Sequence, residues 1–301
     1  MRGFSFSLSF RYVGPTDESG RPHGAHGVVH LYGGGSYEGG WRLGKMDGAG
    51  RLADSTGSVY DGQWREGRRE GQGALVSAAG DRYEGEWLAD KRHGRGAAVW
   101  IDGRSYEGEW REGLFHGEGT YTAADGVYVG AFVEGKRCGR GKVTYADGDV
   151  YEGEWADDKY EGEGAHAFAN GSTYAGGHRA GQPDGRGAKR WANGRAYVGE
   201  WRMGSRHGDG VMTFASGTRY EGFFVEGKME GEGRFVCHTG SAYEGGFLAN
   251  RFHGRGRMRY ANGDSYEGEW ADDKRHGHGT LRCASGRVDE GEWRGGIFIS
   301  A

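Results

Sequence analysis

Residues 83–105 read YEGEWLADKRHGRGAAVWIDGRS, and this stretch determines the fold because its pattern returns along most of the chain. Its first residue, Tyr83, has equivalents every 23 residues, except that Tyr106 and Tyr128 are 22 residues apart. The tyrosines mark the starts of eleven units, at residues 37, 60, 83, 106, 128, 151, 174, 197, 220, 243 and 266. A fixed period of this length predicts a repeat architecture, in which each unit packs against its neighbours.

Glycines and aromatic residues recur at constant places in each unit, counted from the tyrosine as position zero. Glycine occupies positions +2, +11, +13 and +20 in all eleven units, which accounts for 44 of the 65 glycines. Position +4 is Trp or Phe in ten units, and His178 is the exception. Position +7 is always Gly, Asn or Asp, the residue types that tolerate positive φ. Asp-Gly or Asn-Gly at positions +19 and +20, as at Asp102-Gly103, is a strong hairpin signal.

Each unit therefore predicts a strand, a turn, a second strand and a second turn. Because side chains alternate across a strand, Tyr83 and Trp87 share one face and the two glutamates between them share the other. The bare glycines on the aromatic face leave room for large rings from neighbouring strands. No segment has a sustained helical period, so essentially no helix is expected. The fold predicted is all-β, an elongated, twisted single antiparallel sheet of about eleven to twelve 23-residue hairpins.

The sequence predicts three regions. Residues 24–295 form the repeat array, and residues 296–301 form a short apolar C-terminal end. Residues 1–23 form an N-terminal segment in which the alternation from Phe4 to Tyr12 indicates a capping strand, with a targeting sequence as the weaker alternative. The core is expected to be an aromatic ladder, represented by Tyr83, Trp87, Tyr106, Trp110, Tyr151, Trp155, Tyr266 and Trp270.

The composition excludes several classes of protein. Collagen needs abundant proline, and this chain has only 3 prolines. An aromatic content of 13% argues against a disordered linker. A net charge of −4 gives no reason to expect nucleic acid as a partner. Three widely spaced cysteines fit a reducing compartment, and no apolar run is long enough to span a membrane.

The chemistry-bearing residues are better explained by structure than by a reaction. The glutamates are repeated in equivalent copies, whereas catalysis needs one distinguished site, so we expect a solvated acidic face and no catalytic residues. Position +10 carries His, an acid or Cys, but successive copies lie too far apart to share a metal. The best candidate cluster is His276, His278 and Cys283, although hydrogen bonding to a neighbouring turn is the better explanation of position +10. We predict no metal, no cofactor and no nucleotide site.

Basic residues gather at positions +8 and +9 in nine of the eleven units. They are expected to form a basic row along one long edge of the sheet. Such a row contacts either a protein partner or anionic lipid headgroups, or it only keeps the turns soluble. The candidate contact residues are Lys91, Arg92, Lys136, Arg137, Lys274 and Arg275.

The 23-residue unit resembles the MORN repeat (membrane occupation and recognition nexus), and residues 83–105 and 266–288 are nearly ideal copies. In this respect the chain is similar to the MORN proteins of radial spoke heads and of the protist cytoskeleton. It implies a single antiparallel sheet, a non-enzymatic scaffold role and protein partners. It also implies a cytoplasmic location, at the cytoskeleton or the axoneme of a cilium or flagellum.

The functional hypothesis is a non-catalytic structural scaffold that docks protein partners in a cytoskeletal or axonemal assembly. The alternative is a peripheral membrane adaptor that binds anionic phospholipids through the basic edge. The regulatory part of an enzyme is disfavoured because few residues lie outside the repeats. The apolar end after the last full unit, together with the end-to-end dimers that the resemblance implies, predicts a homodimer or a complex with another protein, joined through residues from about 266 to 301.

Overall fold

The computed structural model describes residues 11–31 and 33–300. The chain forms two compact units, and the first ends at Asp147 while the second begins at Gly148. Most of the predicted capping segment, from Phe4 onward, lies outside the described residues. The strands of the first unit are β1 (Arg11–Val13), β2 (Gly24–His30), β3 (Ser36–Arg42), β4 (Lys45–Ala53), β5 (Val59–Arg65), β6 (Arg68–Val76), β7 (Arg82–Leu88), β8 (Lys91–Val99), β9 (Ser105–Arg111), β10 (Leu114–Ala123), β11 (Gly126–Val133) and β12 (Lys136–Tyr145).

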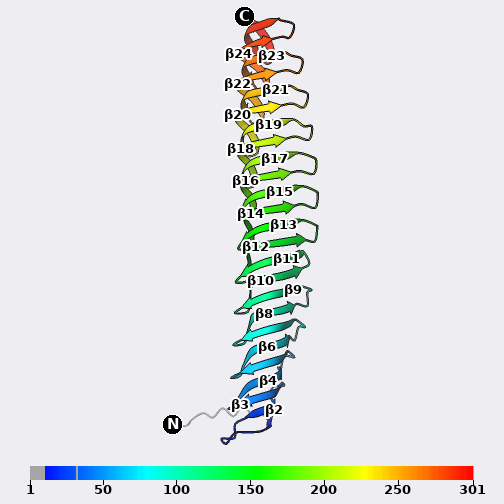
Figure 1. Cartoon of the computed structure of the whole chain (residues 1–301), viewed down its shortest axis with the longest axis vertical. Coiled ribbons are helices and arrows are strands. Elements are labelled where there is room, and N and C mark those ends of the chain that lie inside the picture. Colours follow the sequence, from blue (N-terminus) through cyan, green and yellow to red (C-terminus); the bar gives the residue numbers. More distant parts are fainter. Residues whose placement is uncertain (1–10, 32, 301) are drawn as a thin grey trace, which may run out of the picture. The chain divides into compact units, whose positions relative to one another are not determined.

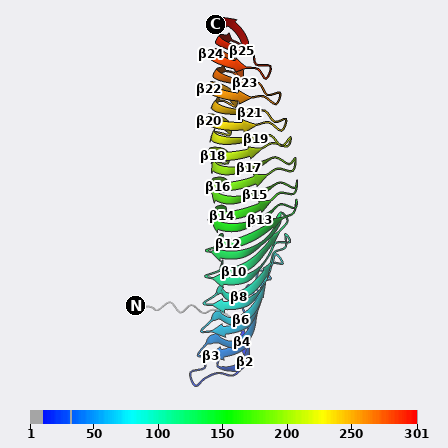
Figure 2. The ribbon, with the colours of Figure 1, turned by 45° about the horizontal axis from the view of Figure 1, so that its top comes forward.

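The second unit is built in the same way. Its strands are β13 (Val150–Ala156), β14 (Lys159–Ala167), β15 (Thr173–Arg179), β16 (Gln182–Arg190), β17 (Ala196–Arg202), β18 (Ser205–Thr213), β19 (Arg219–Val225), β20 (Lys228–Val236), β21 (Ala242–Leu248), β22 (Arg251–Arg259), β23 (Ser265–Ala271), β24 (Lys274–Arg282), β25 (Val288–Arg294) and β26 (Ile297–Ser300). Within each unit every strand pairs antiparallel with the next one in sequence, as Figures 1 and 2 show. The described residues contain no helix, and the predicted all-β antiparallel fold of hairpin repeats is confirmed.

The two strands of each repeat are joined by a tight two-residue turn at positions +6 and +7. In the third repeat these residues are Ala89 and Asp90, with φ of 48° and 71°, between the paired residues Leu88 and Lys91. Positive φ at both central residues defines the type I′ turn, whose twist matches that of the strands. The sequence predicted the positive φ at +7 but not at +6, where alanine, glutamate and other ordinary residues adopt it in every repeat.

The Asp-Gly and Asn-Gly pairs lie in the wider turn that leads into the next repeat. The Trp100 N–H donates to the Arg104 carbonyl (2.9 Å), and the Gly103 N–H donates to the Trp100 carbonyl (3.0 Å). Gly103 has a φ of 88°, so this loop closes on a left-handed glycine. The fourth repeat lacks one residue here, and its Ala123 pairs directly with Gly126.

A bulge interrupts each hairpin next to the tight turn. In the third repeat the register shifts between Gly85 and Glu86, and Gly94 takes a φ of 54°. The Arg95 N–H donates to the Glu86 carboxylate (2.9 Å), which satisfies a backbone group that the bulge takes out of the ladder. Glu84 is exposed as the alternation predicts, whereas Glu86 is half-buried because its carboxylate binds the bulge.

Candidate interaction surface

One face of the strands in each unit is covered by the aromatic ladder, the tyrosines at position 0 with the aromatic residues at +4. Tyr83 meets the edge of Trp87 in its own repeat (ring centroids 5.1 Å apart) and that of Trp110 in the next (5.3 Å). In the second unit Tyr266 packs in the same way against Trp270 (5.2 Å). All eight representative ladder residues are buried, namely Tyr83, Trp87, Tyr106, Trp110, Tyr151, Trp155, Tyr266 and Trp270.

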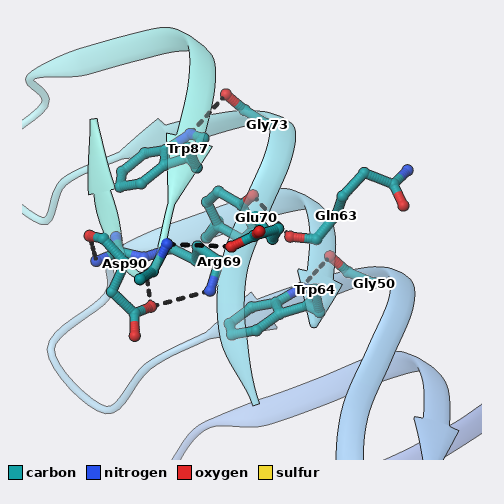
Figure 3. Close-up of polar contacts among 10 residues, drawn as sticks. Gly50, Gln63, Trp64, Arg69, Glu70, Gly73, Trp87 and Asp90 are labelled. Carbon is teal, nitrogen blue, oxygen red and sulfur yellow. Dashed lines mark hydrogen bonds and ion pairs between the residues drawn. The ribbon is translucent and has the colours of Figure 1, made fainter. Parts of the chain in front are cut away.

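The indole groups of the ladder are fixed by hydrogen bonds to the preceding repeat. Trp87 Nε1 donates to the Gly73 carbonyl (3.0 Å), and Trp64 Nε1 donates to that of Gly50 (2.9 Å) (Figure 3). The same bond joins Trp110, Trp201, Trp270 and Trp293 to the glycine fourteen residues earlier. Each of these six indole N–H groups therefore has an acceptor, and each bond links one repeat to the one before it.

The glycines at +2 and +13 form the floor on which the tyrosines lie. Gly85 pairs with Gly96 across the hairpin, and the Tyr83 phenol covers Gly96. A Cβ on Gly96 would lie 2.7 Å from Cζ of Tyr83, and real Cβ atoms are essentially never this close to another heavy atom. The Tyr83 hydroxyl donates to the Glu86 carbonyl (2.8 Å). Glycine is thus required by the close approach of the ring.

Burial of the tyrosines changes their acidity. Desolvation raises the pKa to about 12 for Tyr60, Tyr83, Tyr106, Tyr151, Tyr174, Tyr197 and Tyr266. An unfolded chain ionises at the usual pKa of 10.0, so it releases protons before the folded chain does. We therefore expect the tyrosines' contribution to the free energy of unfolding to be fully present below pH 10, and to be lost as the pH rises from 10 to about 12.

Thermal melts across this range, followed together with phenolate absorbance, check that expectation. Phenolate formation should coincide with unfolding. Titration of these tyrosines near their ordinary pKa in a chain that stays folded would contradict the enclosed ladder.

The basic residues at +8 and those at +9 differ in burial. The lysines at +8 are exposed, and we call Lys91, Lys136 and Lys274 the lysine row. Lys91 forms an ion pair with Glu112 of the next repeat. Exposed ion pairs of this kind contribute little to the stability of the fold, so the lysine row has no evident structural role in it.

The arginines at +9 are half-buried and lie over the ladder. The Arg92 guanidinium carbon is 4.4 Å from the Trp110 ring centroid, and that of Arg275 is 4.2 Å from Trp293. Arg137 lies 5.7 Å from the Tyr128 ring. Such stacking is a cation–π interaction, and burial lowers the pKa of Arg92. One feature of the sequence could have indicated that the +9 side chains lie over the ladder. In other repeats the same position holds flat or apolar residues, such as Met46, Phe115, Tyr160, Met229 and Phe252.

Acids at position +10 bind the tight turn of the next repeat. Glu70 accepts a hydrogen bond from the Ala89 N–H (3.1 Å), and Glu161 accepts one from the Ala180 N–H (3.0 Å). This is the hydrogen bonding to a neighbouring turn that the sequence favoured over metal binding. Within residues 11–31 and 33–300, no group of three His, Cys, Asp or Glu side chains is arranged to hold a metal ion.

His178 replaces the aromatic residue of the seventh repeat and keeps its place in the ladder. Its ring meets the edges of Tyr151 (5.2 Å) and Tyr174 (5.0 Å), and it is buried. Desolvation lowers the pKa of His178, so the imidazole is neutral in the folded chain near neutral pH. The hairpin keeps the usual register, with the shift between Gly176 and His178.

The repeats match the family model of the MORN repeat eleven times, and the chain belongs to the MORN-repeat family. The matched residues are 37–59, 60–82, 83–103, 106–127, 128–150, 151–173, 174–194, 197–219, 220–242, 243–265 and 266–286. Members of this family are repeat scaffolds for protein or membrane interactions and are generally non-catalytic. No curated protein matches the chain. In the part of the chain that the structure describes, no helix has the length and apolar character to cross a membrane.

Solved structures with β-sheet similarity are remote. The SAS-4 (dCPAP) TCP domain of Drosophila melanogaster, in complex with a proline-rich motif of Ana2, is 12% identical, with a TM-score of 0.31, over 57% of this chain and 86% of that one. The TCP10 domain of Danio rerio CPAP, in complex with a STIL peptide, is 10% identical, with a TM-score of 0.26, over 94% and 100%. Similarity at this level identifies neither a common function nor a common ligand.

Proposed function

We propose that this protein is a non-catalytic scaffold that docks protein partners in a cytoskeletal or axonemal assembly of the cytoplasm, including that of a cilium or flagellum. The observation that carries this proposal is that the recurrent residues and the exposed residues of a repeat have different roles. The tyrosine, the aromatic residue at +4 and the glycines pack one hairpin on the next. The exposed positions vary from repeat to repeat, as at +5, which holds Leu88, Arg111, Val133, Ala156 and Leu248.

Such an arrangement presents different side chains at a constant spacing on a regular backbone. Repeat proteins use extended surfaces of this kind to bind other proteins. Membership of a family of generally non-catalytic scaffolds supports the same function.

Imaging of the tagged chain in its native cell, before and after extraction with a nonionic detergent, tests the assembly. We expect the protein to stay with a cytoskeletal or axonemal structure after extraction. Complete release with the detergent-soluble fraction would contradict the proposal.

The second candidate function is a peripheral membrane adaptor, and the lysine row favours it. Position +8 is Lys or Arg in eight of the eleven repeats, and these side chains are exposed in both units: Lys45, Arg68, Lys91, Lys136, Lys159, Lys228, Arg251 and Lys274. Each basic residue near an anionic lipid surface contributes about 1 kcal/mol of binding. The arginines at +9 are less suited to this role because they lie over the ladder.

Flotation with phosphatidylserine vesicles distinguishes this function from the first. If the row binds lipid, Lys91→Glu, Lys136→Glu and Lys274→Glu together should abolish flotation, and added salt should weaken that of the parent. The matched control reverses three exposed arginines at +5, with Arg65→Glu, Arg111→Glu and Arg202→Glu. Equal flotation of the parent and the lysine variant, or none of the parent at low salt, would remove the membrane function.

We also propose self-association through residues 266–301. β26 exposes Ile297 (68%) and Ile299 (55%), whereas Phe298 packs toward Trp293 with ring centroids 5.2 Å apart. Light scattering of the parent chain should give about twice the chain mass of 32.7 kDa. The double variant Ile297→Lys, Ile299→Lys should give the mass of the monomer. A parent chain that stays monomeric at high concentration would contradict this contact.

A further inference from the structure

The aromatic ladder contains one basic ring, that of His178 in the seventh repeat. The other ten repeats carry Trp or Phe at this position, and neither of those side chains can gain a proton. His178 is 6% exposed. Its ring lies among three tyrosines of the second unit, with centroids 5.2 Å from Tyr151, 5.9 Å from Tyr160 and 5.0 Å from Tyr174. The seventh repeat therefore places a group that gains a proton where the others place one that does not.

The surroundings of the imidazole do not suit a second proton. Its Nδ1 atom is buried and has no hydrogen-bond partner among the residues that the structure describes. A protonated imidazole donates from both nitrogens, so protonation in this place would leave a buried N–H without an acceptor. Burial lowers the pKa of His178 by more than a hydrogen bond to the Gly176 backbone raises it. The folded chain thus holds His178 in its neutral form by enclosing it.

The charged groups around His178 do not compensate a proton on its ring. His166 of β14 and Lys189 of β16 lie on the ladder face at position +15, and both are bases. Asp149 is engaged elsewhere, since its carboxylate lies 3.4 Å from His166 Nε2 and accepts a hydrogen bond from the Ala169 N–H (2.7 Å). The other acids of β13, β14 and β16 alternate with the ladder positions and so belong to the opposite face of the sheet: Glu152, Glu154, Glu161, Glu163 and Asp184.

The tyrosine rings offset part of the cost of a charge in this place. The face of an aromatic ring attracts a cation, and Tyr151 and Tyr174 both meet the His178 ring at nearly a right angle, 88° and 85°. Cation–π attraction is nevertheless small beside the cost of removing an unpaired charge from water. A protonated imidazole is therefore more stable in water than in the ladder.

We propose that protonation of His178 opens the ladder at the seventh repeat, so that β15 and β16 act as an acid-sensitive switch in the second unit. With a neutral ring the ladder is continuous, because Tyr174 meets both His178 and Trp201 of the next repeat (5.5 Å). A protonated ring leaves for water, and the edge contacts that it makes with Tyr151 and Tyr174 are lost.

The direction of the pH dependence follows from the difference between the closed and the open ladder. His178 has its ordinary pKa of 6.5 when it is released into water, and a lower pKa when it is enclosed. The open form therefore binds more protons than the closed form as the pH falls below 6.5. The preference for the closed ladder is fully present above pH 6.5, and it is lost as the pH falls through the pKa of the enclosed ring.

Hydrogen exchange of the full chain, followed by mass spectrometry at about pH 7.5 and about pH 5 and corrected for the intrinsic exchange rates, tests the inference. At the lower pH the parent should lose about tenfold or more of its protection over residues 173–190, while β7 to β9 of the first unit keep theirs. His178→Phe should keep its protection at both pH values, because Phe132, Phe224 and Phe247 already occupy this position in other repeats.

The matched control is His276→Phe, which removes an exposed histidine of the eleventh repeat and should lose protection as the parent does. If His178→Phe does not fold, His178→Trp serves, since most repeats carry Trp at this position. Equal loss of protection in the parent and in either folded variant would overturn the inference, and so would a parent that loses none. A loss that His166→Phe abolishes would also overturn it, because the pair of His166 with Asp149 would then be the group that titrates.

Discussion

Replacing Gly62 with alanine should destabilise the first unit by about 3 kcal/mol or more. Gly62 of β5 faces Gly73 of β6, and the new methyl group would meet the backbone of that strand. The methyl carbon would lie 2.7 Å from the Gln72 carbonyl oxygen and 2.6 Å from the Tyr60 hydroxyl. Backbone atoms cannot rotate away, so the two strands must separate or the ring must leave its place.

Chemical denaturation of Gly62→Ala beside Asp61→Ala measures this effect. Asp61 is the neighbouring residue of the same strand, and it is exposed, so its replacement should change the free energy of unfolding by less than about 0.5 kcal/mol. Equal stability of the two variants would show that the glycine pair is not a close approach.

Trp110→Ala should cost about 3–5 kcal/mol, the usual range for deleting a buried aromatic ring. The Trp110 ring is 3% exposed and meets Tyr83 and Tyr106 edge-on, with centroids 5.3 Å and 5.1 Å away. Its indole N–H donates to the Gly96 carbonyl (2.9 Å), and Arg92 stacks on its face. The substitution removes all of these contacts and leaves a cavity between two repeats.

Trp100→Ala is the control for this prediction. Trp100 is only half-buried and lies outside the ladder, so its loss should cost much less than that of Trp110. A melting curve that Trp110→Ala leaves unchanged would contradict the claim that the rings form the core.

The period of 23 residues was enough to predict the hairpins, the ladder and the glycine floor, because each of these repeats with the sequence. The turn at +6 was missed because ordinary residues such as Ala89 and Glu112 adopt positive φ there. Their own propensity does not favour it, and the tight I′ turn imposes it. The bulge at Gly94 was missed for a related reason, since strict alternation assumes an uninterrupted ladder.

The candidate contact residues were harder to predict because adjacent positions in a strand face different ways. Lys91 and Arg92 look alike in a sequence, yet one is exposed and the other lies over Trp110.

Proximity labelling in the native cell tests the scaffold function most directly. The labelling enzyme fused to the full chain should enrich proteins of one cytoskeletal or axonemal structure over the free enzyme. The same set should remain when Lys91, Lys136 and Lys274 are replaced by glutamate. Enrichment no different from that of the free enzyme, or a set of membrane proteins that disappears with the lysine replacements, would contradict the scaffold function.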